Sequence, residues 1–176
     1  MRIYVARHGQ TQWNAENKIC GRTDLPLTAQ GLAQAEELAD KVEKLDIDLI
    51  LSSPMLRARQ TAQASAARLG VALEIDDRLI EQDYGIYEGA DRYTPGFLAN
   101  KRQFACRYPG GESRFQVAAR GDSLLEDLKV RYPGKNILLV CHGGICRVIR
   151  TYFEDMTNED YANYCEENAA VREYRL

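Results

Sequence analysis

Residues 3–14 read IYVARHGQTQWN. The first four are apolar, and such a short run is typical of one buried strand. The run ends on Arg7 and His8, which are followed by Gly9. In open parallel α/β sheets, ligands bind beyond the carboxyl ends of the strands. The stretch therefore predicts a strand that carries a cation and an imidazole to a ligand-binding edge.

A second stretch, residues 136–144, has the same design and reads NILLVCHGG. Its apolar run ends on His142, and the chain contains only two histidines. Carboxyl ends of parallel strands meet at one edge of a sheet, so the two strands can bring both imidazoles into one pocket.

The rest of the chain alternates between strand and helix patterns. We expect strands over residues 2–6, 48–51, 71–75 and 137–140, and helices over 28–44, 54–69, 113–132 and 145–153. Thr28 suits a helix N-cap, and Gly70 suits a helix stop. The alternation predicts an α/β fold with a mostly parallel central sheet and helices on both faces. Residues 169–174 are predicted to add an antiparallel edge strand.

Residues 76–112 break this alternation, because glycine, tyrosine and charged residues mix there. One short helix is expected over residues 97–104. A long irregular insertion in a compact domain is usually functional, although it can be a plain surface excursion. We expect a single domain over residues 1–176, with a short irregular cap insertion over about 76–112.

The composition excludes several classes of protein. A net charge of −3 without a basic stripe argues against nucleic-acid binding. The five cysteines lack a C-x-x-C pair and indicate reduced thiols, hence a cytoplasmic protein. No apolar run approaches the roughly 20 residues of a membrane span, and no signal peptide is recognisable. Two histidines and scattered carboxylates lack metal-ligand spacing, so we expect neither metal nor cofactor. The oligomeric state has no signature in the sequence.

The predicted strand ends gather positive groups around one carboxylate. Arg7, His8 and His142 follow strands directly, Arg57 lies early in a helix after a strand, and Glu81 follows the short third strand. Arginine offers a planar fork to phosphate oxygens, and a Gly-Gly helix start adds N–H groups aimed at an anion. The expected partner is a small phosphorylated metabolite.

Binding alone would not hydrolyse such a compound. Phosphomonoester hydrolysis requires up to ~10²¹-fold acceleration, about 28 kcal/mol. Five charge-assisted hydrogen bonds would contribute roughly 8–15 kcal/mol and positioning roughly 7–11 kcal/mol. The difference calls for a nucleophile and an acid. A neutral imidazole beside Arg7 and Arg57 can attack phosphorus, and Glu81 is the candidate to protonate the leaving oxygen.

These residues also resemble a known family. Residues 7–14 (RHGQTQWN) look like the Arg-His-Gly signature of the histidine phosphatase superfamily, in its phosphoglycerate-mutase-like branch. Further blocks follow in the family's order: 21–28 (GRTDLPLT), 30–31 (QG), 52–62 (SSPMLRARQTA), 81–89 (EQDYGIYEG), 111–113 (GES) and 142–144 (HGG). The resemblance covers most of the chain, and the blocks are specific only together. The family's mostly parallel sheet agrees with the strand pattern.

The resemblance implies a role for each matching residue. His8 would be the phosphorylated nucleophile and Glu81 the proton donor. The phosphate would be held by Arg7, Arg57 and His142, and the site lined by Asn14, Cys20, Gly21 and the backbone of Gly143. Cys20 stands where a serine or threonine is common, so a hydroxyl contact is missing. Six further residues are candidates to contact the organic part of the substrate, although solvated surface charge is the simpler interpretation of most of them: Arg22, Tyr84, Arg92, Lys101, Arg102 and Arg107.

Several alternatives remain open. Residues 88–112 are shorter than the cap of the mutases that the chain resembles, so water should reach the intermediate, which favours phosphatase over phosphoglycerate-type mutase. A non-catalytic phosphate-ester binding protein is a third possibility. Cys141 and Arg147 have the C-x₅-R spacing of cysteine-based phosphatases. Glu88 rivals Glu81 but is interpreted as structural.

Overall fold

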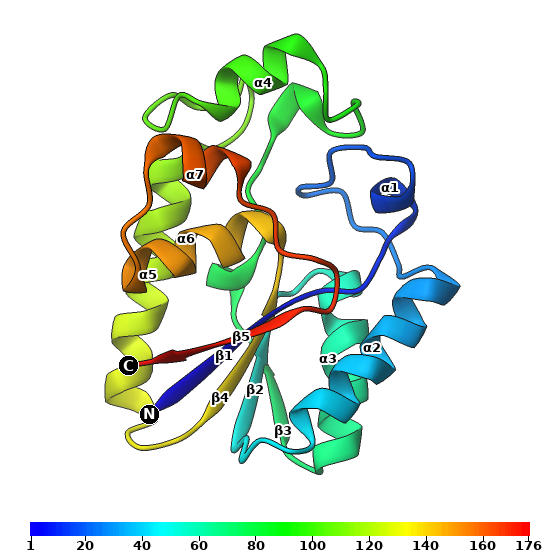
Figure 1. Cartoon of the computed structure of the whole chain (residues 1–176), viewed down its shortest axis with the longest axis vertical. Coiled ribbons are helices and arrows are strands. Elements are labelled where there is room, and N and C mark those ends of the chain that lie inside the picture. Colours follow the sequence, from blue (N-terminus) through cyan, green and yellow to red (C-terminus); the bar gives the residue numbers. More distant parts are fainter.

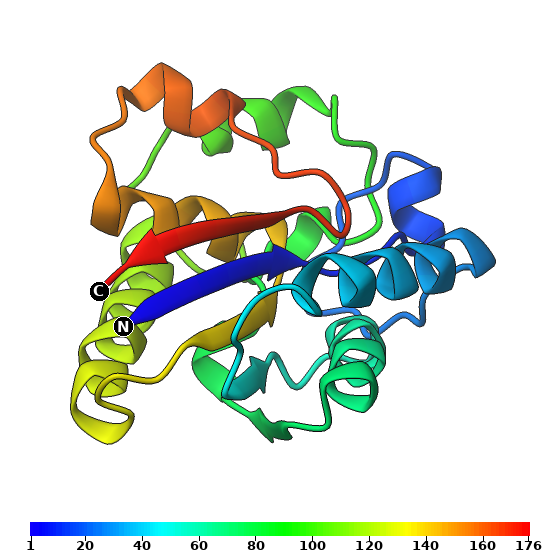
Figure 2. The same ribbon diagram turned by 60° about the horizontal axis from the view of Figure 1, so that its bottom comes forward.

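The computed structural model describes residues 1–176 and contains one five-stranded sheet (Figure 1). The strands lie in the order β3-β2-β4-β1-β5. Their bounds are β1 (Arg2–Arg7), β2 (Leu49–Ser52), β3 (Ala72–Ile75), β4 (Ile137–Cys141) and β5 (Val171–Arg175). The first four run parallel, whereas β5 lies antiparallel to β1, as Figure 2 shows. The predicted α/β fold is confirmed, including its antiparallel edge strand.

The inner strands are buried on both faces because helices cover both. Along β1, Ile3 and Val5 belong to one apolar cluster, and Tyr4 and Ala6 to the other. Successive side chains of a strand point to opposite faces, so a continuous apolar run fills both. This explains why β1 is apolar and buried from Ile3 to Ala6, between the exposed Arg2 at its start and Arg7 at its carboxyl end.

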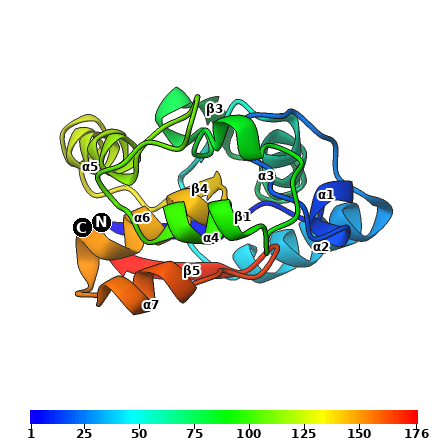
Figure 3. The ribbon, with the colours of Figure 1, turned by 90° about the horizontal axis from the view of Figure 1, so that it is seen from above.

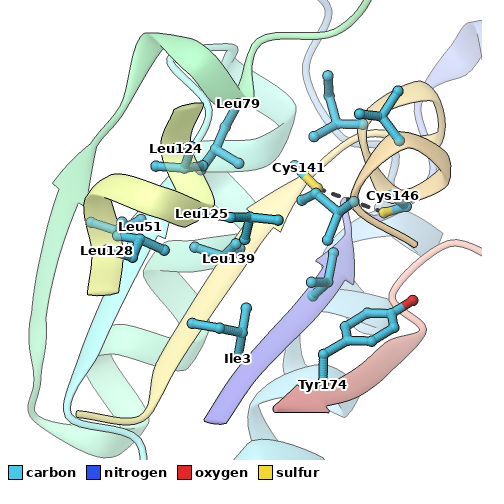
Figure 4. Packing of buried hydrophobic residues seen from close by; sticks show 14 of the residues in the cluster. Ile3, Leu51, Leu79, Leu124, Leu125, Leu128, Leu139, Cys141, Cys146 and Tyr174 are labelled. Atoms are coloured by element: carbon cyan, nitrogen blue, oxygen red, sulfur yellow. Dashed lines mark hydrogen bonds between the residues drawn. The ribbon is translucent and has the colours of Figure 1, made fainter. Parts of the chain in front are cut away.

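Four long helices form the two outer layers. Residues of α2 (Ala29–Val42) and α3 (Leu56–Leu69) pack in the cluster that contains Tyr4. Residues of α5 (Arg114–Arg131) and α6 (Gly143–Phe153) pack in the cluster that contains Ile3, together with Leu124, Leu125 and Leu139 (Figure 4). None of the helices has both the length and the apolarity that crossing a bilayer requires.

Several helix ends follow local signals, whereas the start of α3 does not. The Thr28 hydroxyl accepts a hydrogen bond from the Gly31 amide, and Gly70 ends α3 with φ +66°, as predicted. The start of α3 was expected at residue 54 but lies at Leu56. Its amide donates to the carboxylate of Asp24, 2.7 Å away. A loop distant in sequence therefore sets this helix start.

Short elements gather beyond the carboxyl ends of the strands. Residues 76–112 contain two 3₁₀ turns, η1 (Asp77–Leu79) and η2 (Gly85–Tyr87), and helix α4 (Pro95–Lys101), which lies somewhat earlier than the expected 97–104. Figures 1 and 3 show α4 above the ends of β1 and β4. Two further helices were not predicted, α1 (Gln12–Ala15) and α7 (Asn158–Asn163). Both are too short to show a helical period, and each begins with a capping box.

Candidate active site

The two histidines lie side by side at the ends of neighbouring strands. His8 follows β1 and His142 follows β4, and these strands pair in parallel with Arg7 opposite Cys141. The ring centroids are 5.0 Å apart, and both side chains are buried. The structure therefore brings together the two imidazoles that the paired His-Gly strand ends predicted.

The hydrogen bonds of His8 define its tautomer. Its Nδ1 lies 2.6 Å from the carbonyl oxygen of Gly9, which can only accept, so Nδ1 carries the proton. The Nε2 atom accepts from Nε of Arg57 at 3.3 Å. Burial, followed by the charges of Arg57 and Arg7, holds the pKa of His8 well below its usual range. The ring is therefore neutral, with the lone pair on Nε2.

Arg57 is fully buried and is held by main-chain oxygens. Its two terminal nitrogens donate to the carbonyls of Thr23 (3.0 Å) and Gly21 (2.7 Å). The Thr61 hydroxyl donates to the Arg57 carbonyl and accepts the Gly9 amide, which ties α3 to the His8 loop. Arg57 forms no ion pair with a carboxylate, so its charge is available to an anion at His8.

Glu88 binds the loop of residues 21–23, whose carbonyls accept hydrogen bonds from Arg57. Its carboxylate accepts the amides of Gly21, Arg22 and Thr23 at 3.0–3.3 Å, and the Thr23 hydroxyl at 2.9 Å. The glutamate that the sequence suggested as structural thus fixes a backbone segment. Through the carbonyls of that segment it orients Arg57 toward His8.

His142 has one satisfied nitrogen and one free nitrogen. Its Nε2 lies 2.7 Å from the hydroxyl of Ser53, a contact that the sequence did not predict. Its Nδ1 is buried and has no partner in the protein. Burial, Arg57 and His8 hold the pKa of His142 well below its usual range. Two uncharged imidazoles, those of His8 and His142, therefore lie together beside Arg57.

Glu81 lies at the start of α6. One carboxylate oxygen accepts the amide of Gln82 at 2.8 Å, and the other accepts the amide of Gly144 at 3.0 Å. A Cβ at position 144 would collide with this carboxylate, so glycine is required there. Arg22 contacts the main chain instead: its Nε donates to the Glu81 carbonyl at 2.7 Å, and it pairs with Glu112 at 3.1 Å.

A cavity of about 50 Å³ opens between these groups. Of the predicted residues, seven line it: Arg7, His8, Asn14, Cys20, Glu81, Tyr84 and Gly143. The other four predicted residues do not line the cavity: Arg57, His142, Gly21 and Arg22. Of these, Arg57 donates a hydrogen bond to His8, and the His142 ring lies beside the His8 ring. Arg7 donates to the Glu166 carbonyl, and its buried Nε has no partner. No three His, Cys, Asp or Glu side chains converge as metal ligands.

The lining also contains Arg92, for which the sequence left substrate contact and surface charge both open. Five further lining residues were not assigned to the site from the sequence: Ile19, Phe97, Gly144, Arg147 and Cys165. Arg147 had a signal, because it lies one helical turn after Gly143 and so shares its face of α6. Cys165 had none. It belongs to an irregular segment in which Asn168 donates to the carbonyl of His8 at 2.8 Å.

The cysteine of the C-x₅-R motif faces away from the cavity. Cys141 is fully buried in the apolar cluster, 3.6 Å from Sγ of Cys146 (Figure 4). Burial raises the pKa of the Cys141 thiol well above its usual range. A protonated thiol in an apolar cluster is a poor nucleophile, so the geometry favours the imidazole.

Comparisons with known proteins agree with this arrangement. The family model described as "Histidine phosphatase superfamily (branch 1)" matches residues 3–176. A relative from Escherichia coli O1:K1 / APEC, named probable phosphoglycerate mutase GpmB, is 37% identical over 150 residues, which are 81% of this chain and 70% of the relative.

Two solved structures extend the comparison. A mycobacterial glucosyl-3-phosphoglycerate phosphatase complexed with VO₃ has a TM-score of 0.89 at 30% identity, covering 98% of this chain and 91% of its own. A mutant phosphoserine phosphatase from Entamoeba histolytica, in complex with phosphoserine, has a TM-score of 0.86 at 27% identity, covering 98% and 89%.

Proposed function

The chain belongs to branch 1 of the histidine phosphatase superfamily, and from this premise we propose that it hydrolyses small phosphomonoesters through a phosphohistidine on His8. The superfamily contains phosphatases and mutases, and the solved structures compared above are named as phosphatases. The observation that carries the proposal is the unprotonated Nε2 of a neutral His8 beside the cavity, which accepts a hydrogen bond from the buried Arg57 at 3.3 Å.

In the first step, Nε2 of His8 attacks phosphorus. The N–P bond forms as the bond to the ester oxygen breaks, and Glu81 in its acid form gives that oxygen a proton. Charge builds on the phosphoryl oxygens, which receive hydrogen bonds from Arg7, Arg57 and the free nitrogen of His142. Donors that are already fixed around the phosphoryl oxygens stabilise such charge without reorganising.

In the second step, water attacks the phosphorus of the phosphohistidine. The carboxylate of Glu81 accepts the water's proton, the N–P bond breaks, and inorganic phosphate leaves. His8 returns to its starting tautomer because Nδ1 keeps its proton throughout, held by the Gly9 carbonyl. Every proton that moves is exchanged with Glu81, and Arg7 and Arg57 supply the positive charge that faces the phosphoryl oxygens, so the proposed steps use no metal ion.

Two reactions compete for the phosphohistidine: hydrolysis by water, and transfer of the phosphoryl group to another position of the substrate. We propose that residues 76–112 form a short cap on a single domain, which leaves water access to His8. The cavity of about 50 Å³ adjoins a larger hollow under this cap. The relative named as a mutase makes isomerisation the second candidate.

Measuring phosphate release and isomer formation together tests the proposal. We expect the purified protein to release phosphate from p-nitrophenyl phosphate and from small phosphomonoesters in the presence of a chelator, with no isomerised product. Isomerisation of 3-phosphoglycerate that depends on 2,3-bisphosphoglycerate and outpaces release would reassign the protein as a mutase. Absence of both reactions would indicate a phosphate-ester binding protein.

Glu88→Gln tests how Arg57 is positioned. The amide loses the charge that four donors share, so the loop of Gly21 and Thr23 should loosen and Arg57 with it. A hydrogen bond to a charged group contributes roughly 1.5–3 kcal/mol, so we expect about a 10- to 100-fold loss of kcat/KM. Since Glu88 transfers no proton, the loss should be equal for aryl and alkyl phosphates. Unchanged kinetics would show that the loop holds Arg57 without Glu88.

A further inference from the structure

A second hollow of about 290 Å³ continues from the catalytic cavity. The two share five lining residues: Tyr84, Arg92, Phe97, Arg147 and Cys165. Aromatic side chains form much of the shared wall, where Tyr84 and Phe97 pack edge to face at 5.6 Å. The hollow therefore offers space, beside aromatic rings, for the organic part of a molecule whose phosphoryl group reaches His8.

The hollow is lined by four cationic residues and no acidic one. Arg92 and Lys101 come from the cap segment, Arg114 from α5 and Arg147 from α6. None of the four forms an ion pair, although thirteen ion pairs occur elsewhere in the chain. Charges contributed by three segments thus face one space with no protein counter-ion.

Arg114 is the clearest case. The residue is 4% exposed, and only one nitrogen has a partner, the hydroxyl of Tyr108 at 2.9 Å. Its Nε and other terminal nitrogen are buried without any partner. The guanidinium lies 5.4 Å from the centre of the Tyr108 ring and 5.7 Å from that of Phe104. A buried charge that lacks a partner is costly, so a ligand anion is the missing element.

Arg147 and Lys101 repeat the pattern. Arg147 donates to the Tyr164 carbonyl at 2.7 Å, and its buried Nε has no partner. Burial, followed by the charges of Arg147 and Arg114, lowers the pKa of Lys101 to about 8. The cations therefore repel one another across the hollow, and a bound anion would relieve that repulsion.

Building on the proposed function, we propose that the substrate carries a second acidic group, a carboxylate or another phosphate, which Arg92, Lys101, Arg114 and Arg147 bind while the phosphoryl group contacts His8. Guanidinium groups suit both kinds of anion, since their fork matches carboxylate and phosphate oxygens. The substrate class is thus a small phosphomonoester with two anionic ends and a carbon skeleton between them.

Matched ligands test this class without relying on turnover. Binding to the His8→Ala variant is measured by calorimetry for 3-phosphoglycerate against glycerol 3-phosphate, which differ in one carboxylate. A parallel pair, fructose 1,6-bisphosphate against fructose 6-phosphate, tests a second phosphate. In at least one pair, we expect the ligand with an acidic group at both ends to bind about 10- to 100-fold more tightly than its partner. This is the effect of one charge-assisted hydrogen bond. The pair that responds identifies the acidic group.

Variants attribute the preference to the hollow. Arg147→Gln and Lys101→Met, each in the His8→Ala background, should reduce the preference to a few-fold or less. Arg102→Gln is the matched control, because Arg102 follows Lys101 but is exposed and lines neither hollow. Equal binding of both members in both pairs, or a preference that survives both variants, overturns the inference. Phosphate release by the unmodified protein stands apart from these outcomes and tests the proposed function alone.

Discussion

Replacing His8 by alanine is expected to lower phosphate release at least about 10⁴-fold, as losses of a nucleophile do in other enzymes. The physical reason is that the proposed mechanism leaves no second nucleophile beside Arg57, since His142 engages Ser53 through Nε2 and donates to the phosphoryl group through Nδ1. The loss should fall on kcat, because the arginines that we propose to bind the phosphoryl group remain. Initial rates with p-nitrophenyl phosphate measure it, and circular dichroism checks the fold.

Cys141→Ala is the matched control for His8→Ala. Cys141 ends the neighbouring strand, but its sulfur lies in the apolar cluster with Cys146. We expect the variant to keep its activity. Rapid quenching of the unmodified protein during turnover should trap an acid-labile phosphoryl group on His8. A phosphoryl group on sulfur, or equal turnover in the alanine variant of His8, would refute the proposed nucleophile.

Glu81→Gln is expected to slow the reaction by about 10²–10⁴-fold, the usual contribution of general acid–base catalysis. The effect should depend on the leaving group. An alkoxide leaves poorly without a proton, whereas p-nitrophenolate leaves readily. The loss in the first step should therefore be larger for an alkyl phosphate than for p-nitrophenyl phosphate, and stopped-flow release of p-nitrophenol separates that step from hydrolysis.

Glu88→Gln is the control variant for Glu81→Gln, because it separates proton transfer from positioning of the backbone. Both variants replace a carboxylate that accepts backbone amides, so both loosen the local backbone. Only Glu81 borders the cavity. A loss for Glu81→Gln that is the same for both leaving groups would assign Glu81 a positioning role like that of Glu88.

Local pattern was sufficient for the strands, several helix ends and the adjacency of the histidines. The run of residues 3–6 is apolar because β1 is covered on both faces, and the same holds for β4. Parallel pairing of two such strands leaves little freedom for the residues that follow them. His8 and His142 therefore had to lie close together once the sheet formed.

Local pattern could not reveal which groups orient these histidines. The contact between Arg57 and His8 depends on carbonyls of residues 21 and 23, and those depend on Glu88, some 65 positions along the chain. Ser53 and Asn168 reach the histidines in the same indirect way. Such contacts have no period, since they arise when irregular segments close over the sheet.

The sequence alone determined that two apolar strands end in His-Gly and that arginines and Glu81 follow the strands, because burial imposes a regular spacing on residues close together in the chain. Only the tertiary structure decided that Arg57 donates to Nε2 of His8 and that Arg92, Lys101, Arg114 and Arg147 face one hollow. Charges from segments far apart in sequence converge through the packing of α4, α5 and α6, and long-range packing leaves no local periodicity in the residues that it joins.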